Sequence, residues 1–252
     1  MAAVAVVGNL SLDRVAGARP RIGGGAYHAA RALRIVSRSA SIVTRCADAD
    51  RRFLLHRLAA LGLPLRVLHG EHTTAFSFTY VGDQRLMHVD AVGDAWTSDD
   101  VGALDRRVRW VQVAPLLRSD FDAETLATLA RGRRLLLDGQ GLVRARRTGP
   151  LQLDADFDPR LLEHVAILKL AEEEAEVVGE VDVPELLITR ASRGSTVCFG
   201  GRSVDVPAFP LPRDPTGAGD TFGAAYLASR AGGYSPVAAA RRATSVVASL
   251  LL

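Results

Sequence analysis

The sequence is poor in residues that cross-link a chain or anchor it in a membrane. Its 252 residues include only two cysteines, Cys46 and Cys198, which lie far apart and outside any Cys-x-x-Cys pair. This spacing argues against a disulfide framework and a cysteine-ligated metal, and two reduced thiols are ordinary in a cytosolic protein. No apolar run approaches the roughly 20 residues that a membrane helix needs. The first residues lack a basic leader, so we expect a cytoplasmic protein without a signal peptide or membrane partner.

Lysine is almost absent as well, because Lys169 is the only one and arginine supplies the other basic side chains. The net charge is a modest +3, and aromatic residues make up only 6% of the chain. A nucleic-acid interface would favour a basic patch with interleaved aromatic residues, and no such patch is present. We therefore interpret Arg144, Arg146 and Arg147 as solvated surface and expect no nucleic-acid partner.

What the sequence does contain is an alternation of strand and helix patterns along most of its length. Short β-branched runs predict buried strands, and segments with helical spacing lie between them. The clearest strand runs are 3–7, 110–113, 135–138 and 166–170. Such alternation predicts an α/β fold with a mostly parallel sheet. The length suits one large domain, so we treat residues 1–252 as a single unit.

The most informative stretch is 214–222, Asp-Pro-Thr-Gly-Ala-Gly-Asp-Thr-Phe, which predicts a loop that becomes a helix. The backbone N–H groups of Gly217, Ala218 and Gly219 would lie unpaired at the helix N-terminus, where the helix dipole favours an anion. Asp220 would repel a bound phosphate unless its carboxylate accepts a proton from an attacking hydroxyl. The alternative is a tight turn followed by an aspartate that only caps the helix.

Residues 214–224 resemble the C-terminal signature of the ribokinase, or PfkB, family of small-molecule kinases. The resemblance extends over nearly the whole chain and implies a ribokinase-like three-layer α/β sandwich. It also implies that Asp220 is the catalytic base and that Gly217, Ala218 and Gly219 form the anion hole for the transferred phosphoryl group. The segments at 23–28 and 138–141 most resemble the short inositol-kinase-like branch of the family.

On the acceptor side, the resemblance assigns substrate binding to residues that follow predicted strands. Asp13 would bind substrate hydroxyls, for which a carboxylate is apt because it accepts several hydrogen bonds. Gly24 and Gly25 would pack against the sugar, and His28 stands where the family has an asparagine. Gln140 would face the cleft, unless its segment is a simple left-handed glycine turn. The alternative for His28 is a helix residue packed under the sheet.

On the donor side, the resemblance implies binding of ATP and Mg²⁺. Glu174 aligns with a family glutamate that acts on the Mg²⁺ shell, although Ala171 replaces the asparagine that accompanies it. The alternative is that the three acidic residues at this helix start only interact favourably with the helix dipole and bind no metal. Ala191 replaces a glycine of the family's nucleotide-phosphate segment. The implied cofactor-binding residues are Lys169, Thr189, Gly194, Thr216, Gly217 and Gly219, with a surface lysine as the alternative for Lys169.

Residues 72–92 change to an alternating pattern around a Gly-Asp turn, which predicts a β-hairpin. In the family a small β-lid covers the sugar and can also mediate dimerisation. We therefore interpret the hairpin as a reduced lid and a possible homodimer contact. An ordinary edge of the main sheet is the alternative.

These features predict an ATP-dependent kinase that phosphorylates a hydroxyl of a small sugar or polyol, inositol-like or a hexose or pentose. A nucleoside kinase of the same fold is the second hypothesis, with Phe76, Phe78 and Tyr80 as the aromatic residues near the cleft. The departures from the family pattern leave a third hypothesis, a homologue that binds ligand without transferring phosphate. A dinucleotide-dependent dehydrogenase is disfavoured because Gly8 is not followed by a G-x-G-x-x-G pattern.

Overall fold

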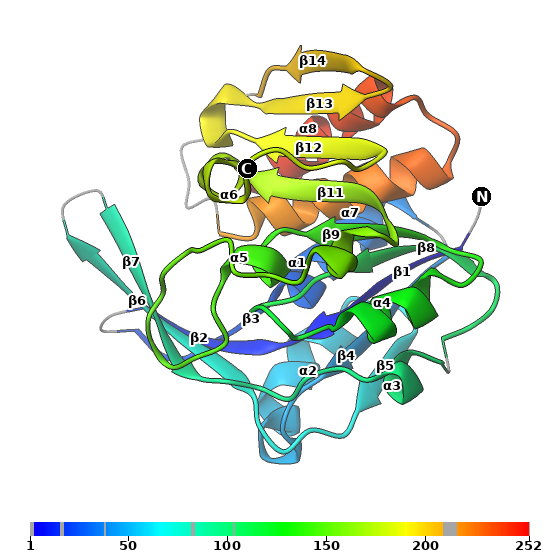
Figure 1. The fold of residues 1–252 in the computed structure, drawn as a ribbon. Coiled ribbons are helices and arrows are strands. Elements are labelled where there is room, and N and C mark those ends of the chain that lie inside the picture. Colours follow the sequence, from blue (N-terminus) through cyan, green and yellow to red (C-terminus); the bar gives the residue numbers. More distant parts are fainter. Residues whose placement is uncertain are drawn as a thin grey trace.

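The computed structural model describes residues 3–15, 18–37, 39–81, 84–102, 104–208 and 216–251 (Figure 1). Its centre is a nine-stranded sheet in the order β14-β13-β12-β11-β9-β8-β1-β4-β5. The pairs from β5 to β12 are parallel, and β13 and β14 add an antiparallel hairpin at one edge. The predicted, mostly parallel α/β sheet is thus confirmed. The strands are β1 (Ala3–Asn9), β4 (Ala40–Arg45), β5 (Leu65–Leu68), β8 (Val108–Val113), β9 (Arg134–Asp138), β11 (Val165–Ala171), β12 (Glu185–Thr189), β13 (Ser195–Phe199) and β14 (Arg202–Val206).

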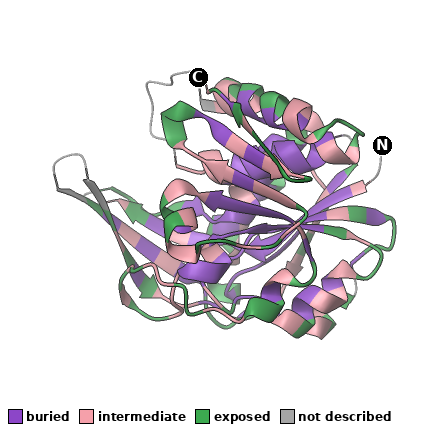
Figure 2. Ribbon diagram, turned by 45° about the horizontal axis from the view of Figure 1, so that its top comes forward, coloured by how far each residue is buried: buried purple, intermediate pink, exposed green. Residues whose placement is uncertain are grey.

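Helices cover both faces of this sheet and complete three layers. One face packs against α1 (Gly25–Val36), α2 (Arg51–Ala59), α7 (Ala218–Ala231) and α8 (Pro236–Leu251). The other packs against α3 (Ser98–Gly102), α4 (Ala123–Ala130), α5 (Gln140–Val143) and α6 (Glu172–Val178). The central strands and the inward helix faces are buried (Figure 2). Within the described ranges, no helix combines the length and apolarity needed to cross a bilayer.

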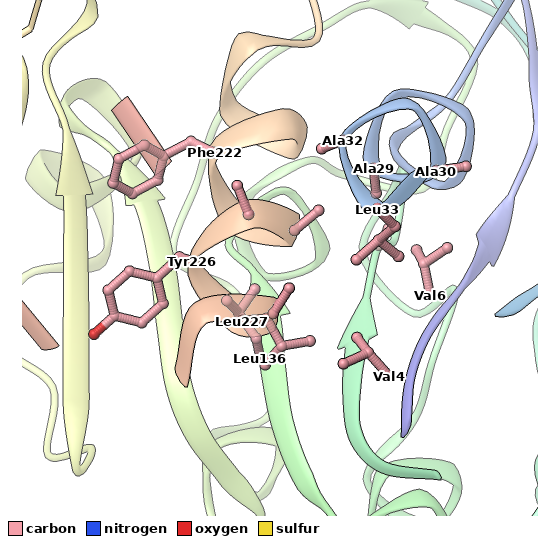
Figure 3. Close-up of a cluster of buried hydrophobic side chains, with 14 of the residues drawn as sticks. Val4, Val6, Ala29, Ala30, Ala32, Leu33, Leu136, Phe222, Tyr226 and Leu227 are labelled. Carbon is pink, nitrogen blue, oxygen red and sulfur yellow. The ribbon is translucent and has the colours of Figure 1, made fainter. Parts of the chain in front are cut away.

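The helix that follows the glycine-rich stretch, α7, is buried from Asp220 to Ser229. Its neighbour α1 presents Ala29 and Leu33 to the shared core, where small side chains let two helices pack closely (Figure 3). At the opposite side of α7, the Tyr226 hydroxyl donates a 2.7 Å hydrogen bond to Glu185 of β12. Arg230 pairs with the same carboxylate at 2.5 Å. These contacts fix α7 between α1 and the sheet, and therefore fix the position of its N-terminus.

A second, five-stranded sheet lies beside the main one in the order β10-β7-β6-β2-β3. Its strands are β2 (Ser11–Val15), β3 (Arg21–Gly23), β6 (Thr74–Val81), β7 (Gln84–Ala91) and β10 (Gly149–Pro150). The predicted hairpin is present as β6 and β7, which pair antiparallel. The interpretation as an edge of the main sheet is wrong, because β6 pairs with β2 in this separate sheet. Asp13 follows the end of β1, and it lies inside β2 rather than in a turn.

Candidate active site

A cavity of about 580 Å³ opens at the carboxyl ends of β9, β11 and β12, next to the second sheet. Ligands of open α/β sheets bind at this edge. Every site residue proposed from the sequence lines the cavity, which brings segments from both ends of the chain together. Their individual roles stay predictions, and Asp214 and Pro215 of the motif lie outside the described residues. The lining residues in question are Asp13, Gly24, Gly25, His28, Gln140, Lys169, Glu174, Thr189, Gly194, Thr216, Gly217, Ala218, Gly219 and Asp220.

The N-terminus of α7 forms one wall of the cavity. Gly217 is the residue before the helix and has a left-handed φ of 78°, which a side chain would disfavour. A Cβ atom at this position would also lie 2.2 Å from Nδ1 of His28, so the imidazole packs directly against the turn. Gly217 has no side chain that could cap the helix start. The first N–H groups of α7 are therefore available to an anion.

Asp220 lies in the first turn of α7 and is only 8% exposed. Its Oδ1 atom has no hydrogen-bond partner among the residues that the structure describes. A Cβ atom on Gly25 would lie 2.7 Å from this oxygen, so the absence of a side chain there leaves room beside the carboxylate. Gly24 supplies the φ of 97° from which α1 begins. The carboxylate is thus buried and held close to the start of α1, with one oxygen unpaired.

Asp220 belongs to a group of five charged side chains that we call the buried charge cluster, of which Arg144 is half-buried and the others are buried: Asp138, Arg144, Lys169, Glu174 and Asp220. Lys169 Nζ bonds to Oδ2 of Asp138 at 3.0 Å and is only 3% exposed, so the surface-lysine interpretation is wrong. The same ammonium would lie 3.0 Å from a Cβ atom on Gly219. Lys169 therefore places a positive charge beside the start of α7.

Burial shifts the pKa values of this cluster, and so does the charge imbalance, since the cluster contains three carboxylates and two cations. Burial raises the pKa of Asp220 to about 7, Asp138 adds to the rise, and Lys169 and Arg144 oppose it. Burial also raises the pKa of Glu174. Burial lowers the pKa of Lys169, but the three nearby carboxylates outweigh this effect and raise it overall. A carboxylate whose pKa lies near 7 suits proton transfer at neutral pH.

The acceptor end of the cavity combines Asp13 with an apolar wall. Asp13 is 5% exposed, and Ser11 Oγ donates a 2.7 Å hydrogen bond to its Oδ1 atom. A Cβ atom on Gly23 would lie 2.2 Å from the other carboxylate oxygen, so the backbone of β3 packs against this side chain. His28 is half-buried and lines the cavity, whereas the alternative placed it under the sheet. The apolar wall consists of Phe76, Phe78, Met87 and Leu116.

The segment after β9 forms the helix α5, and its first residue is Gln140. The left-handed turn considered for this segment is wrong, because Gly139 has a φ of −62° and Gly141 lies within α5. Gly139 instead permits close packing, since a Cβ atom there would lie 3.1 Å from Oε2 of Glu174. Gln140 thereby joins the cavity wall next to α6.

The donor end shows how the departures from the expected pattern are accommodated. Ala191 has a φ of 47°, so the chain keeps a left-handed backbone where a glycine was expected. Gly194 has a φ of 98°, and a Cβ atom there would lie 2.1 Å from the carbonyl oxygen of Val206. The hydroxyl of Thr189 donates to the carbonyl oxygen of Leu170 at 3.2 Å. These contacts keep the end of β12 and its following turn beside the cavity.

A single carboxylate, Glu174, marks the predicted metal position. Its Oε2 atom accepts a 2.8 Å hydrogen bond from the N–H of Ala171, so one oxygen serves the helix start. No group of three or more metal-ligating side chains is found in the described part of the chain. Mg²⁺ is often held by one or two carboxylates plus water and substrate phosphates. The residues present therefore fit a metal that arrives with a phosphate donor better than a protein-caged metal.

Comparison with known proteins identifies the family to which this chain belongs. The model of the pfkB family carbohydrate kinases matches residues 4–251. The chain belongs to this family. Inositol 3-kinases of Zea mays and Oryza sativa subsp. japonica are each 30% identical over 70% of this chain, which supports the inositol-kinase-like branch. The matches cover 48% and 47% of those proteins, so the chain spans about half of their length.

Solved structures of the family share the fold. A pyrophosphate-dependent kinase in the ribokinase family, complexed with a pyrophosphate analogue and myo-inositol, has a TM-score of 0.85 at 22% identity, covering 98% of this chain and 94% of that one. The nucleoside kinase of Burkholderia thailandensis in complex with inosine has a TM-score of 0.78 at 21% identity, covering 98% and 90%. The three-layer, ribokinase-like sandwich expected from the sequence is confirmed.

Arg144 is a charged cavity residue that the sequence reasoning missed. It was interpreted as solvated surface together with Arg146 and Arg147, but it lines the cavity. Arg146 lies 3.4 Å from the buried carboxylate of Asp120, and Arg147 bonds to Gln152, so these two arginines have partners elsewhere and Arg144 alone of the three lines the cavity. The available signal was the four-residue spacing from Gln140, which places both residues on one side of a short helix.

Proposed function

We propose that this protein transfers the γ-phosphoryl group of ATP to a hydroxyl group of a small sugar or polyol. The observation that supports this most strongly is the carboxylate of Asp220. It is buried at the uncapped start of α7, has an unpaired oxygen, and shares one cavity with Asp13. Family membership supports the same class of reaction. An aspartate that only capped the helix would bond to the helix N–H groups, and no such bond is found among the described residues.

In the proposed reaction, Asp13 binds hydroxyl groups of the acceptor and orients one of them toward Asp220. Asp220 accepts the proton of that hydroxyl as its oxygen bonds to the γ-phosphorus of ATP. The N–H groups at the start of α7 and the ammonium of Lys169 stabilise the negative charge on the phosphoryl oxygens. ADP leaves with the electron pair of the broken bond.

The excess of carboxylates in the buried charge cluster bears on the need for a metal. A donor with several phosphate groups would meet net negative charge there if all five side chains were ionised. Glu174 is the residue that would help to hold Mg²⁺ beside the donor. When bound, Mg²⁺ supplies charge neutralisation and polarises the phosphoryl oxygens.

We infer an inositol-like polyol as the first acceptor to test, because the plant relatives are inositol 3-kinases. A nucleoside is the second candidate, since Phe76 and Phe78 line the cavity and could stack a base. The donor also has an alternative, because a similar structure is a pyrophosphate-dependent kinase. ATP is favoured because the donor end extends along α8 to Thr244, Val247 and Ala248, where an adenine could pack.

The experiment is a matrix of donors and acceptors with the purified protein. ATP and pyrophosphate are each combined with myo-inositol, hexoses, pentoses and nucleosides, and phosphorylated product is detected by mass spectrometry. Transfer from ATP to a polyol or sugar is expected. Transfer only from pyrophosphate would overturn the proposed donor, and transfer only to nucleosides would overturn the proposed acceptor. Tight acceptor binding without transfer from either donor would support the non-catalytic homologue instead.

A further inference from the structure

Arg144 is the one member of the buried charge cluster to which the proposed function gives no task. It is the residue that ends α5, and its side chain lines the cavity together with Gln140. Its backbone is fixed, because its N–H donates to the carbonyl oxygen of Gln140 at 3.1 Å and its carbonyl oxygen accepts from Arg118 at 2.6 Å. The fold therefore holds Arg144 at the cavity wall.

The guanidinium of Arg144 lacks the partners that nearby arginines have. Arg118 pairs with Asp154, and Arg146 lies 3.4 Å from Asp120. Among the residues that the structure describes, no side chain forms an ion pair with Arg144, and its Nε atom is buried without a hydrogen-bond partner. A buried N–H group that stays unpaired is costly, unless a ligand completes it.

The position of Arg144 indicates which kind of ligand could bind its guanidinium. Its charge lowers the pKa of both Asp220 and Glu174, so it lies near the predicted base as well as the predicted metal carboxylate. In the proposed reaction, the phosphoryl group passes between these two side chains. A guanidinium forms strong paired hydrogen bonds with phosphate oxygens and stays charged at any relevant pH.

We propose that Arg144 is a further catalytic residue, whose guanidinium contacts the phosphoryl group as it moves from donor to acceptor. This inference rests on the proposed phosphotransfer function. The bond from phosphorus to the donor oxygen breaks, the bond to the acceptor oxygen forms, and the acceptor proton moves to Asp220, while Arg144 keeps its own protons. Lys169 and the α7 N–H groups line the same cavity, so they would act on the moving charge together with Arg144.

The test compares Arg144→Gln and Arg144→Lys with a matched control, Arg147→Gln, which changes an exposed arginine three residues away. Because Arg144 has no ion pair among the described residues, Arg144→Gln should keep the thermal unfolding midpoint within about 2 °C of wild type. With the best donor and acceptor, Arg144→Gln should lower kcat about 100-fold and change each KM by less than about 3-fold. Arg144→Lys should recover part of the loss, and Arg147→Gln should behave as wild type.

Binding measurements separate this role from ground-state binding. By calorimetry, Arg144→Gln should bind ATP with Mg²⁺ within about 3-fold of wild type, but bind ADP with Mg²⁺ and aluminium fluoride about 100-fold more weakly. The acid limb of kcat/KM should also move to higher pH. The charged groups that then act on Asp220 are Asp138 from β9, Lys169 from β11 and Glu174 from α6, while His28 from α1 lies against Gly217 at the start of α7.

Each other outcome has a distinct meaning. Wild-type kcat in Arg144→Gln would overturn the inference, as would equal weakening of ATP and the aluminium fluoride complex. A loss of kcat seen only with acceptors that carry an acidic group would show that Arg144 binds the acceptor, and it would also overturn the inference. If wild type transfers phosphate to no acceptor, the proposed function fails first. In that case the affinity of the protein for inorganic phosphate is the remaining test of Arg144. If Arg144→Gln leaves this affinity unchanged, the proposed contact between Arg144 and a phosphoryl group is overturned.

Discussion

Replacing Gly25 with alanine tests whether Asp220 must be held where the structure places it. The new methyl carbon would lie 2.7 Å from Oδ1 of Asp220 and 2.9 Å from Cβ of Ala114. The φ angle of Gly25 is not in the left-handed region, so alanine adds no backbone strain. Since carbon atoms prefer about 3.5 Å or more, the carboxylate or the start of α1 must shift by roughly half an ångström or more.

A shift of this size should matter more for catalysis than for folding. Misplacement by about 1 Å can cost about 100-fold in rate, so Gly25→Ala should lower kcat about 10- to 100-fold. Overpacking of this kind costs about 1–3 kcal/mol of unfolding free energy, which leaves the protein folded at 25 °C. The assay is steady-state transfer with the best acceptor, together with thermal unfolding.

The matched control is Gly102→Ala, because Gly102 also lacks a left-handed φ and a Cβ atom there would meet none of the described atoms within 4 Å. It should leave kcat unchanged. Gly25→Ala with wild-type kcat would refute the reasoning, because the base would then tolerate displacement. A rise in the acceptor KM alone would assign Gly25 to acceptor packing only.

Three other predictions follow from the same site. Because the pKa of Asp220 is raised to about 7, its proton-accepting form fills as pH rises, so kcat/KM should increase through about pH 7 and level off above it. Lys169→Met leaves Asp138 without its cation and should cost about 3 kcal/mol, lowering the thermal midpoint by roughly 6–12 °C; an unchanged midpoint would contradict this. Tyr226→Phe removes the bond to Glu185 and should cost about 1 kcal/mol in denaturant unfolding, with kcat retained.

The sequence was most informative where the residues of one short segment determine the local structure without help from distant parts of the chain. The glycines and Asp220 in 214–222 predict a helix start with free N–H groups and an acid beside it, and the structure has both. Most strands of the main sheet were also predictable, because a buried parallel strand is a continuous apolar run. The runs 195–199 and 202–206 around Gly200-Gly201 predict a second hairpin, and β13 and β14 occupy these residues.

The second sheet could not be predicted, because its pairing joins distant segments. Ser11 of β2 pairs with Thr74 of β6, and Gly149 of β10 pairs with Val89 of β7. Local periodicity contains no information about such partners, so the strand that holds Asp13 was not predicted. The burial of Lys169 and the position of Arg144 at the cavity were not predicted for the same reason. Both depend on charges that other elements bring to the cavity.

The most direct test of the account is phosphoryl transfer by Asp220→Asn under single-turnover conditions with the donor bound. Asparagine has nearly the same shape but accepts a proton far less readily, so donor affinity should stay within about 3-fold while transfer falls about 1,000-fold. That result would support Asp220 as the base at the start of α7. Transfer at the wild-type rate, or loss of donor binding with unchanged transfer in the bound state, would contradict it.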